Sequence, residues 1–233
     1  MINNKHNSPG KVPGVTQSPE DDARASIWFV GLPQVVAAIL GIILYGLLSH
    51  VNLIILVPTG TLDVFLPALL IPLLFGVIYG PWVGLITGGF GFLLGDYVAN
   101  LWLHDLSWGN GYLFYGSALI NFRDLIGWNG FTGYLANGMI GLVAGLTQIL
   151  TRRRYNNFES LATVGVITAA GVAVSIAIVV YSAVLVYHSP YYRAAEATMA
   201  FFDTVLPNLL FALVMLPLLL FIGDAIVWSK GRA

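Results

Sequence analysis

The sequence predicts an all-α integral membrane protein, built as a six-transmembrane-helix bundle with both termini cytoplasmic. Of its 233 residues, 58% are hydrophobic and only 9% are charged, whereas soluble domains carry about 25% charged residues. The apolar stretches are long and continuous, which favours helices over the alternating strands of a membrane barrel. The net charge of −1 excludes a nucleic-acid partner that is bound through a basic surface.

Six apolar runs each approach or exceed the ~20 residues that a helix needs to cross the bilayer core. The predicted spans are about 27–49, 61–80, 81–104, 131–151, 159–187 and 200–228. Together they form a membrane domain over residues 26–233. Residues 1–25 are rich in Asn, Ser, Pro and Gly and lack apolar periodicity, which predicts a disordered cytoplasmic tail. The polar and aromatic segment 105–130 is predicted to be an outward loop at the membrane–water interface.

Basic residues indicate the orientation of the spans. With six spans, one side of the membrane carries both termini and the loops near 80–81 and 152–158. That side holds Lys5, Lys11, Arg24, Arg152, Arg153, Arg154, Lys230 and Arg232. The opposite side holds only Arg123 and Arg193. Because cytoplasmic loops are enriched in Lys and Arg, the termini are predicted to be cytoplasmic.

Small residues recur every four positions in the apolar runs. Gly84 and Gly88 repeat in the third run, and Gly141 and Gly145 repeat in the fourth. This spacing lets helix backbones approach closely in lipid, so we expect these glycines to pack inside the bundle. Ala37 and Gly41 form the same kind of pair in the first run. For that pair, internal packing and docking onto another membrane protein both stay open.

Polar residues gather toward the predicted outer end of the spans. Asp96, Asn100 and His104 are spaced four apart, which places them on one helical face. A rise of ~1.5 Å per residue brings further polar residues to a similar depth. These are Asp63, Tyr134, Asn137 and Asn208, with Trp108 in the loop above. Ionisable residues in a membrane usually face a cavity or a partner, so the set predicts a binding site for a small polar ligand. The alternative is that residues near helix ends, such as Asp63 and His104, are caps or interfacial groups.

Sequence motifs for catalysis are missing. The chain has no cysteine, no glycine-rich phosphate loop ending in lysine, and no HExxH pair. We therefore predict no catalytic residue, no metal site and no cofactor in this chain, and we do not expect it to be an enzyme.

Several features together resemble the S components of energy-coupling factor (ECF) transporters. The resemblance lies in the six runs, in FGVIYGPWVGLITGGFGFLLGD over 75–96 and in ANGMIGLVAGL over 136–146. It implies a substrate-binding subunit in the plasma (inner) membrane of a prokaryote, which captures a vitamin or related micronutrient from outside. A transmembrane scaffold subunit and two ATPase subunits would be its partners, and these ATPases would use ATP. Ala37 and Gly41 match the family's docking motif, while no signature selects thiamine, riboflavin, cobalamin or another compound.

Two other functions stay open at this point. The chain could be a stand-alone secondary transporter in which Asp96 is a proton or cation site, because a desolvated carboxylate can titrate near neutral pH. It could also be a non-transporting membrane scaffold.

Overall fold

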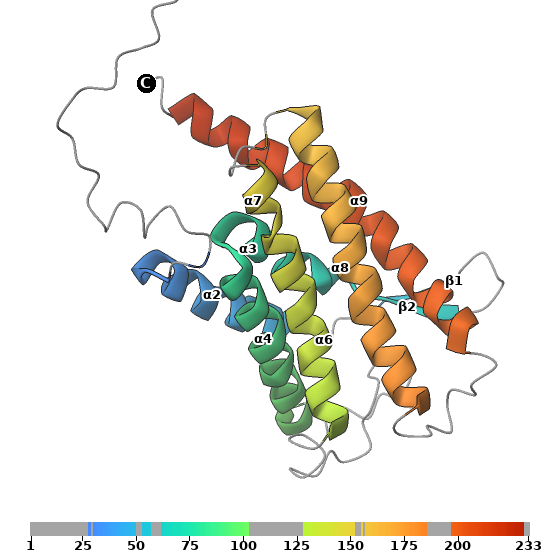
Figure 1. The fold of residues 1–233 in the computed structure, drawn as a ribbon. Coiled ribbons are helices and arrows are strands. Elements are labelled where there is room, and N and C mark those ends of the chain that lie inside the picture. Colours follow the sequence, from blue (N-terminus) through green and yellow to red (C-terminus); the bar gives the residue numbers. More distant parts are fainter. Residues whose placement is uncertain are drawn as a thin grey trace, which may run out of the picture.

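The computed structural model describes residues 28, 30–49, 53–56, 62–102, 128–151, 155, 157–185 and 197–230, and these residues are mostly helical (Figure 1). The elements are α2 (Leu32–Leu48), β1 (Leu53–Leu56), β2 (Leu62–Phe65), the 3₁₀ helix η1 (Pro67–Leu69), α3 (Leu70–Tyr79), α4 (Pro81–Trp102), α6 (Trp128–Gly145), α7 (Thr147–Thr151), α8 (Phe158–Leu185) and α9 (Ala197–Lys230). The predicted tail over 1–25 lies outside the described residues. Most of the predicted loop 105–130 does too, although its last three residues belong to α6.

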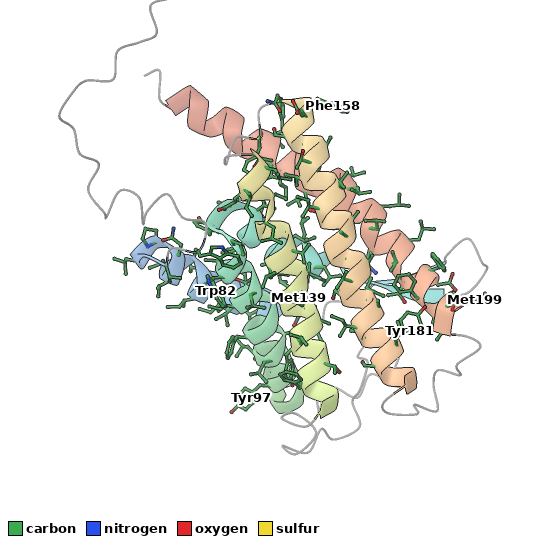
Figure 2. The ribbon with its side chains drawn as sticks, in the orientation of Figure 1. Trp82, Tyr97, Met139, Phe158, Tyr181 and Met199 are labelled. Carbon is green, nitrogen blue, oxygen red and sulfur yellow. The ribbon has the colours of Figure 1, made fainter. Side chains whose placement is uncertain are left out.

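Three helical stretches are long and apolar enough to cross a membrane: Phe131–Thr151, Phe158–Ser182 and Ala197–Gly223. The first of these combines α6 and α7. Large apolar side chains also stand on the outside of the bundle, where Figure 2 labels Trp82, Phe158 and Met199. Such a surface suits lipid rather than water. The structure therefore supports a helical membrane protein.

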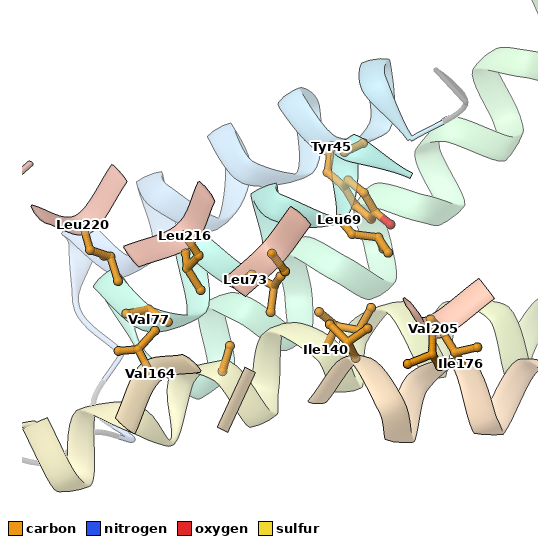
Figure 3. Packing of buried hydrophobic residues seen from close by; sticks show 14 of the residues in the cluster. Tyr45, Leu69, Leu73, Val77, Ile140, Val164, Ile176, Val205, Leu216 and Leu220 are labelled. Atoms are coloured by element: carbon orange, nitrogen blue, oxygen red, sulfur yellow. The ribbon is translucent and has the colours of Figure 1, made fainter. Parts of the chain in front are cut away.

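The shortest of the main helices, α3, lies at the centre of the bundle. Neighbouring helices pack in the order α2, α4, α6, α8 and α9, while α3 contacts α2, α4, α6 and α9. Its side chains Leu73 and Val77 are fully buried. Figure 3 shows them packed against apolar residues of α6, α8 and α9, including Ile140, Val164 and Leu216. A helix that is surrounded in this way can be apolar on all sides.

The start of the second predicted span differs from the prediction. Residues 62–65 form β2, which pairs antiparallel with β1 so that Leu53 lies opposite Phe65 and Leu56 lies opposite Leu62. Leu66 then adopts a non-helical backbone with φ −113° and ψ 76°, because the residue before a proline is disfavoured in the helical region. Pro67 opens η1, and α3 begins only at Leu70. The helical fold class is confirmed, but the helix predicted over 61–80 is corrected to 67–79.

Glycines allow α4 and α6 to touch backbone to backbone. A methyl group added at Gly84 would overlap the Gly141 carbonyl, and one added at Gly141 would overlap the Gly84 carbonyl. Similarly, a methyl group at Gly88 would overlap the Asn137 carbonyl, and one at Gly145 would lie 2.5 Å from Pro81 Cα. The prediction that the small residues of these two runs pack inside the bundle is confirmed.

A sharp corner joins α3 to α4. Gly80 has a φ of 113°, a conformation that glycine tolerates and other residues rarely adopt. Pro81 follows as the first residue of α4 and has no backbone N–H. The Val77 carbonyl, four residues earlier, therefore cannot receive its usual helical hydrogen bond. Two buried side chains donate to it instead, Gln148 Nε2 at 2.8 Å and Tyr155 Oη at 2.8 Å.

We expect the double substitution Gln148→Leu with Tyr155→Phe to lower the free energy of unfolding by about 2 kcal/mol, because a buried carbonyl left without a donor costs about 1–3 kcal/mol. Each single substitution should cost less, since one donor remains. Thermal unfolding of the purified protein in detergent would measure the change. Thr163→Val is a matched control because it removes an exposed side chain-to-backbone hydrogen bond, to Glu159. Equal melting temperatures for the double variant and wild type would contradict this role.

Candidate functional site

Polar side chains from three helices meet at one end of the bundle. Asp96 lies near the carboxyl end of α4 and Tyr134 near the amino end of α6, and Figure 1 shows these two ends together at the bottom of the view. The Asp96 carboxylate lies within electrostatic reach of the hydroxyl groups of Tyr45 and Tyr134. Asp96 itself is half-buried. Asp96 and Tyr134 were predicted at this end from the sequence, whereas Tyr45 was not.

Asn137 occupies the centre of this region and is only 8% exposed. Its Oδ1 accepts a hydrogen bond from the Tyr45 hydroxyl, and its Nδ2 donates to the Gly133 carbonyl at 2.9 Å. The amide thus connects α2 to α6, at the position where Gly88 of α4 packs against the backbone carbonyl of Asn137. Both of its polar atoms are engaged, so its evident role is to position Tyr45. A direct contact between Asn137 and a ligand stays a prediction.

Aromatic rings complete the site. Phe92 lies one helical turn before Asp96 on the same face of α4. Its ring centroid is 6.4 Å from that of Tyr45 and 6.1 Å from that of Tyr134. We call Tyr45, Phe92, Asp96, Tyr134 and Asn137 the Asp96 cluster. The cluster combines one carboxylate, two phenol hydroxyls and three ring faces, which can bind a charged or planar group but offer no nucleophile with an activating base.

Tyr45 and Phe92 were missed because they lie within apolar runs, where an aromatic residue usually packs in the core. The signal for Tyr45 was its hydroxyl, since a buried tyrosine hydroxyl usually needs a hydrogen-bond partner. Tyr45 is 2% exposed. The signal for Phe92 was its spacing of four from Asp96.

Asn208 has a separate structural role. Its Oδ1 accepts a hydrogen bond from the Leu66 backbone N–H at 2.8 Å, and its Nδ2 donates to the Thr204 carbonyl at 2.8 Å. Leu66 belongs to neither a strand nor a helix, so its N–H needs such a side-chain acceptor. Asn208 therefore fastens α9 to the segment that enters η1. Its predicted contact with a ligand is not supported by these bonds.

The remaining predicted site residues are placed only partly. Asn100 follows Asp96 by four residues on α4, and its side chain is not described. His104 and Trp108 lie outside the described residues. Asp63 is on β2, opposite Ile55, and not in the first turn of a helix as the sequence suggested. The described part of the chain contains no group of three or more His, Cys, Asp or Glu that could hold a metal ion.

Of the two interpretations left open for Ala37 and Gly41, the contacts within the chain favour internal packing. Ala37 is 4% exposed and packs with Val83. Gly41 is also buried, and a methyl group added there would overlap Thr87 and lie 3.0 Å from the Phe75 ring. This face of α2 is thus occupied by α3 and α4 of the same chain. The opposite face of α2 exposes large apolar side chains such as Leu40 and Leu47.

Comparison with protein-family models, with curated proteins and with solved structures found no match to this chain.

Proposed function

We propose that this chain is the substrate-binding S component of an ECF-type ABC transporter, which captures a vitamin or related micronutrient for ATP-driven uptake. The observation that carries the proposal is the Asp96 cluster. It gathers a carboxylate, an amide and aromatic side chains from α2, α4 and α6 at one end of the bundle. Polar groups are costly inside a membrane and usually mark a binding site or pathway there. Binding sites of this kind combine many apolar contacts with a few placed polar groups.

The proposed arrangement has six spans in the plasma (inner) membrane of a prokaryote, with cytoplasmic termini. It is supported by the bias of Lys and Arg toward one side of the predicted spans. In this orientation the corner between α3 and α4 lies on the cytoplasmic side. The other end of α4, near Asp96, therefore faces outward. The ligand would reach the cluster from outside. The aromatic segment before α6 lies close in sequence to this end.

The partners in this proposal are a transmembrane scaffold subunit and two ATPase subunits. The chain would bind the ligand, while the partners would hydrolyse ATP and complete transport. The coupling module would have to contact residues other than Ala37 and Gly41, because α3 and α4 cover that face. The lipid-exposed surface of α2 and the other outer helix faces stay available to it.

Binding and uptake measurements test the proposal in two steps. The purified chain in lipid nanodiscs should bind one compound of a vitamin panel that includes thiamine, riboflavin and cobalamin, as measured by calorimetry. Cells should then accumulate that compound only when the scaffold and ATPase subunits are co-expressed. A chain that binds none of these compounds or their precursors would refute the proposal.

A second candidate is a stand-alone secondary transporter that uses Asp96 as a proton or cation site. The position of this carboxylate beside two tyrosine hydroxyls favours it. Uptake into liposomes that contain the chain alone, driven by a pH gradient and lost in Asp96→Asn, would support this function over the first. A non-transporting scaffold would instead tolerate the combined substitution of Asp96, Asn100 and Asn137 without a change in behaviour.

A further inference from the structure

We propose that the ligand of the Asp96 cluster is an organic cation, an alkylated ammonium or an N-alkylated heteroaromatic ring, and this inference rests on the function proposed above. It restricts the ligand from any small polar compound to one whose permanent positive charge is surrounded by the ligand's own carbon groups. The charge of the cluster and the geometry of its rings support it.

The charge at the cluster is negative. Asp96 is its one carboxylate and is half-buried, so its field is screened less than that of a carboxylate in water. The sequence from α2 through α4 adds no positive charge, because no lysine or arginine lies between Arg24 and Arg123. A negatively charged ligand would be repelled by Asp96, and a neutral one could gain from it only by donating a hydrogen bond. A cation would be attracted.

The rings around the carboxylate suit a cation that carries carbon groups. Phe92 lies between Tyr45 and Tyr134, with centroid separations of 6.4 Å and 6.1 Å. The ring planes are tilted by 32° and 58°, so their faces are not stacked in parallel. Ring faces attract a cation that lies within about 6 Å of the centroid, and this attraction grows when water is excluded. Ca²⁺ and Mg²⁺ prefer oxygen ligands to ring faces, whereas alkylated ammonium groups match ring faces and a carboxylate together.

The cluster has few hydrogen-bonding groups for a flat polar ligand. Asn137 is the only amide of the cluster, and its Oδ1 and Nδ2 each already make one hydrogen bond, to Tyr45 and Gly133. This leaves the amide one N–H and one oxygen lone pair. Besides these and the two phenol hydroxyls, the cluster offers a ligand one carboxylate and three ring faces. A quaternary or tertiary nitrogen, which needs few hydrogen bonds, fits these groups.

Pairs of compounds that share a shape and differ in charge test the inference on the wild-type protein. Choline and its neutral isostere 3,3-dimethyl-1-butanol form one pair, and benzyltrimethylammonium and neopentylbenzene form a second. Calorimetry of the full chain in nanodiscs should give an affinity at least about tenfold higher for the cation of each pair. Equal affinities within the pairs would overturn the inference. This comparison needs no variant and so does not depend on how a variant folds.

Two variants assign the effect to the cluster. Asp96→Asn should weaken binding of benzyltrimethylammonium by about tenfold or more, and Phe92→Leu by about fivefold. Tyr97→Phe is the matched control, because Tyr97 is next to Asp96 in sequence and is exposed; its affinity should equal that of wild type. Melting temperatures of all three proteins would show that each is folded. An unchanged affinity in Asp96→Asn would overturn the inference.

The inference and the proposed function fail in different ways. If the chain binds a neutral or anionic vitamin and Asp96→Asn leaves that affinity unchanged, the cation inference is wrong and the S-component proposal stands. If the chain binds no compound from the vitamin panel or from the isostere pairs, both are wrong.

Discussion

Gly84→Ala is expected to destabilise the protein by about 3 kcal/mol or more. The added carbon would overlap the Gly141 carbonyl, which is backbone and cannot move aside as a flexible side chain can. The helices α4 and α6 would have to separate along their whole contact, and overpacking alone typically costs about 1–3 kcal/mol. Gly141→Ala should behave in the same way, because the overlap is reciprocal. Thermal unfolding in detergent, followed by size-exclusion chromatography, measures the effect.

Gly165→Ala is the control for this prediction. Gly165 is also inside a membrane helix, but a methyl group there would meet only a side-chain carbon of Leu213 at 3.4 Å, an ordinary contact. Alanine also has a higher helix propensity than glycine, by about 1 kcal/mol. Gly165→Ala should therefore leave the melting temperature unchanged or raise it. A similar stability for Gly84→Ala and Gly165→Ala would mean that α4 and α6 are farther apart than described.

Asn137→Leu is expected to lower the free energy of unfolding by about 2–3 kcal/mol. It removes the acceptor of the buried Tyr45 hydroxyl, and a buried polar group left unsatisfied costs about 1–3 kcal/mol. Tyr45→Phe should cost less, because it removes that hydroxyl itself. The double variant should be more stable than the sum of the two losses predicts, by about 1 kcal/mol or more. Chemical or thermal unfolding of the four proteins measures this coupling.

Leu135→Ala is a control for the cycle, because Leu135 is exposed on the same helix. It should show no coupling to Tyr45→Phe. Strictly additive losses for Asn137→Leu and Tyr45→Phe would show that the two side chains do not share a hydrogen bond in the membrane.

Much of the helical framework could be predicted from hydrophobic length. Long continuous apolar runs correspond to α4, α8 and α9 because such runs form helices whether they face lipid or protein. The glycine repeats predicted close packing, and the contact of Gly84 with Gly141 has that form. The loop predicted near 80–81 is a sharp corner in the structure, because Gly80 takes a positive φ and Pro81 begins a helix.

The start of α3 was harder to predict, because residues 62–65 consist of Leu, Asp, Val and Phe. A short apolar segment of this kind fits a strand as well as a helix. The strand forms because a partner, β1, is near in sequence and because Pro67 interrupts helical backbone before it. The proline was visible, but the partner strand was part of a segment without a predicted structure.

The candidate site was predicted in part for a similar reason. The depth of a residue in the membrane can be counted from its position along a helix, so Asp96 and Tyr134 were predicted at a similar depth. The direction in which a side chain points depends on which helices pack beside it, and a single sequence does not show that packing. Asn137 bonds to Tyr45, and Gly41 faces Thr87, and both contacts join helices that are far apart in the chain. The same limit explains why Ala37 and Gly41 resembled a docking motif.

Because α3 is short, it spans only part of the thickness of the membrane's apolar layer. Residues 67–79 give about 21 Å of helix, against about 30 Å for the hydrocarbon core. In the proposed arrangement the remaining third is bordered by Leu66 and the strands, whose backbone cannot face lipid and must lie in protein or water. In this arrangement, the apolar layer next to α3 is therefore only about two thirds as thick as the hydrocarbon core of a bilayer. A bound ligand would have already passed part of the membrane before any partner acts.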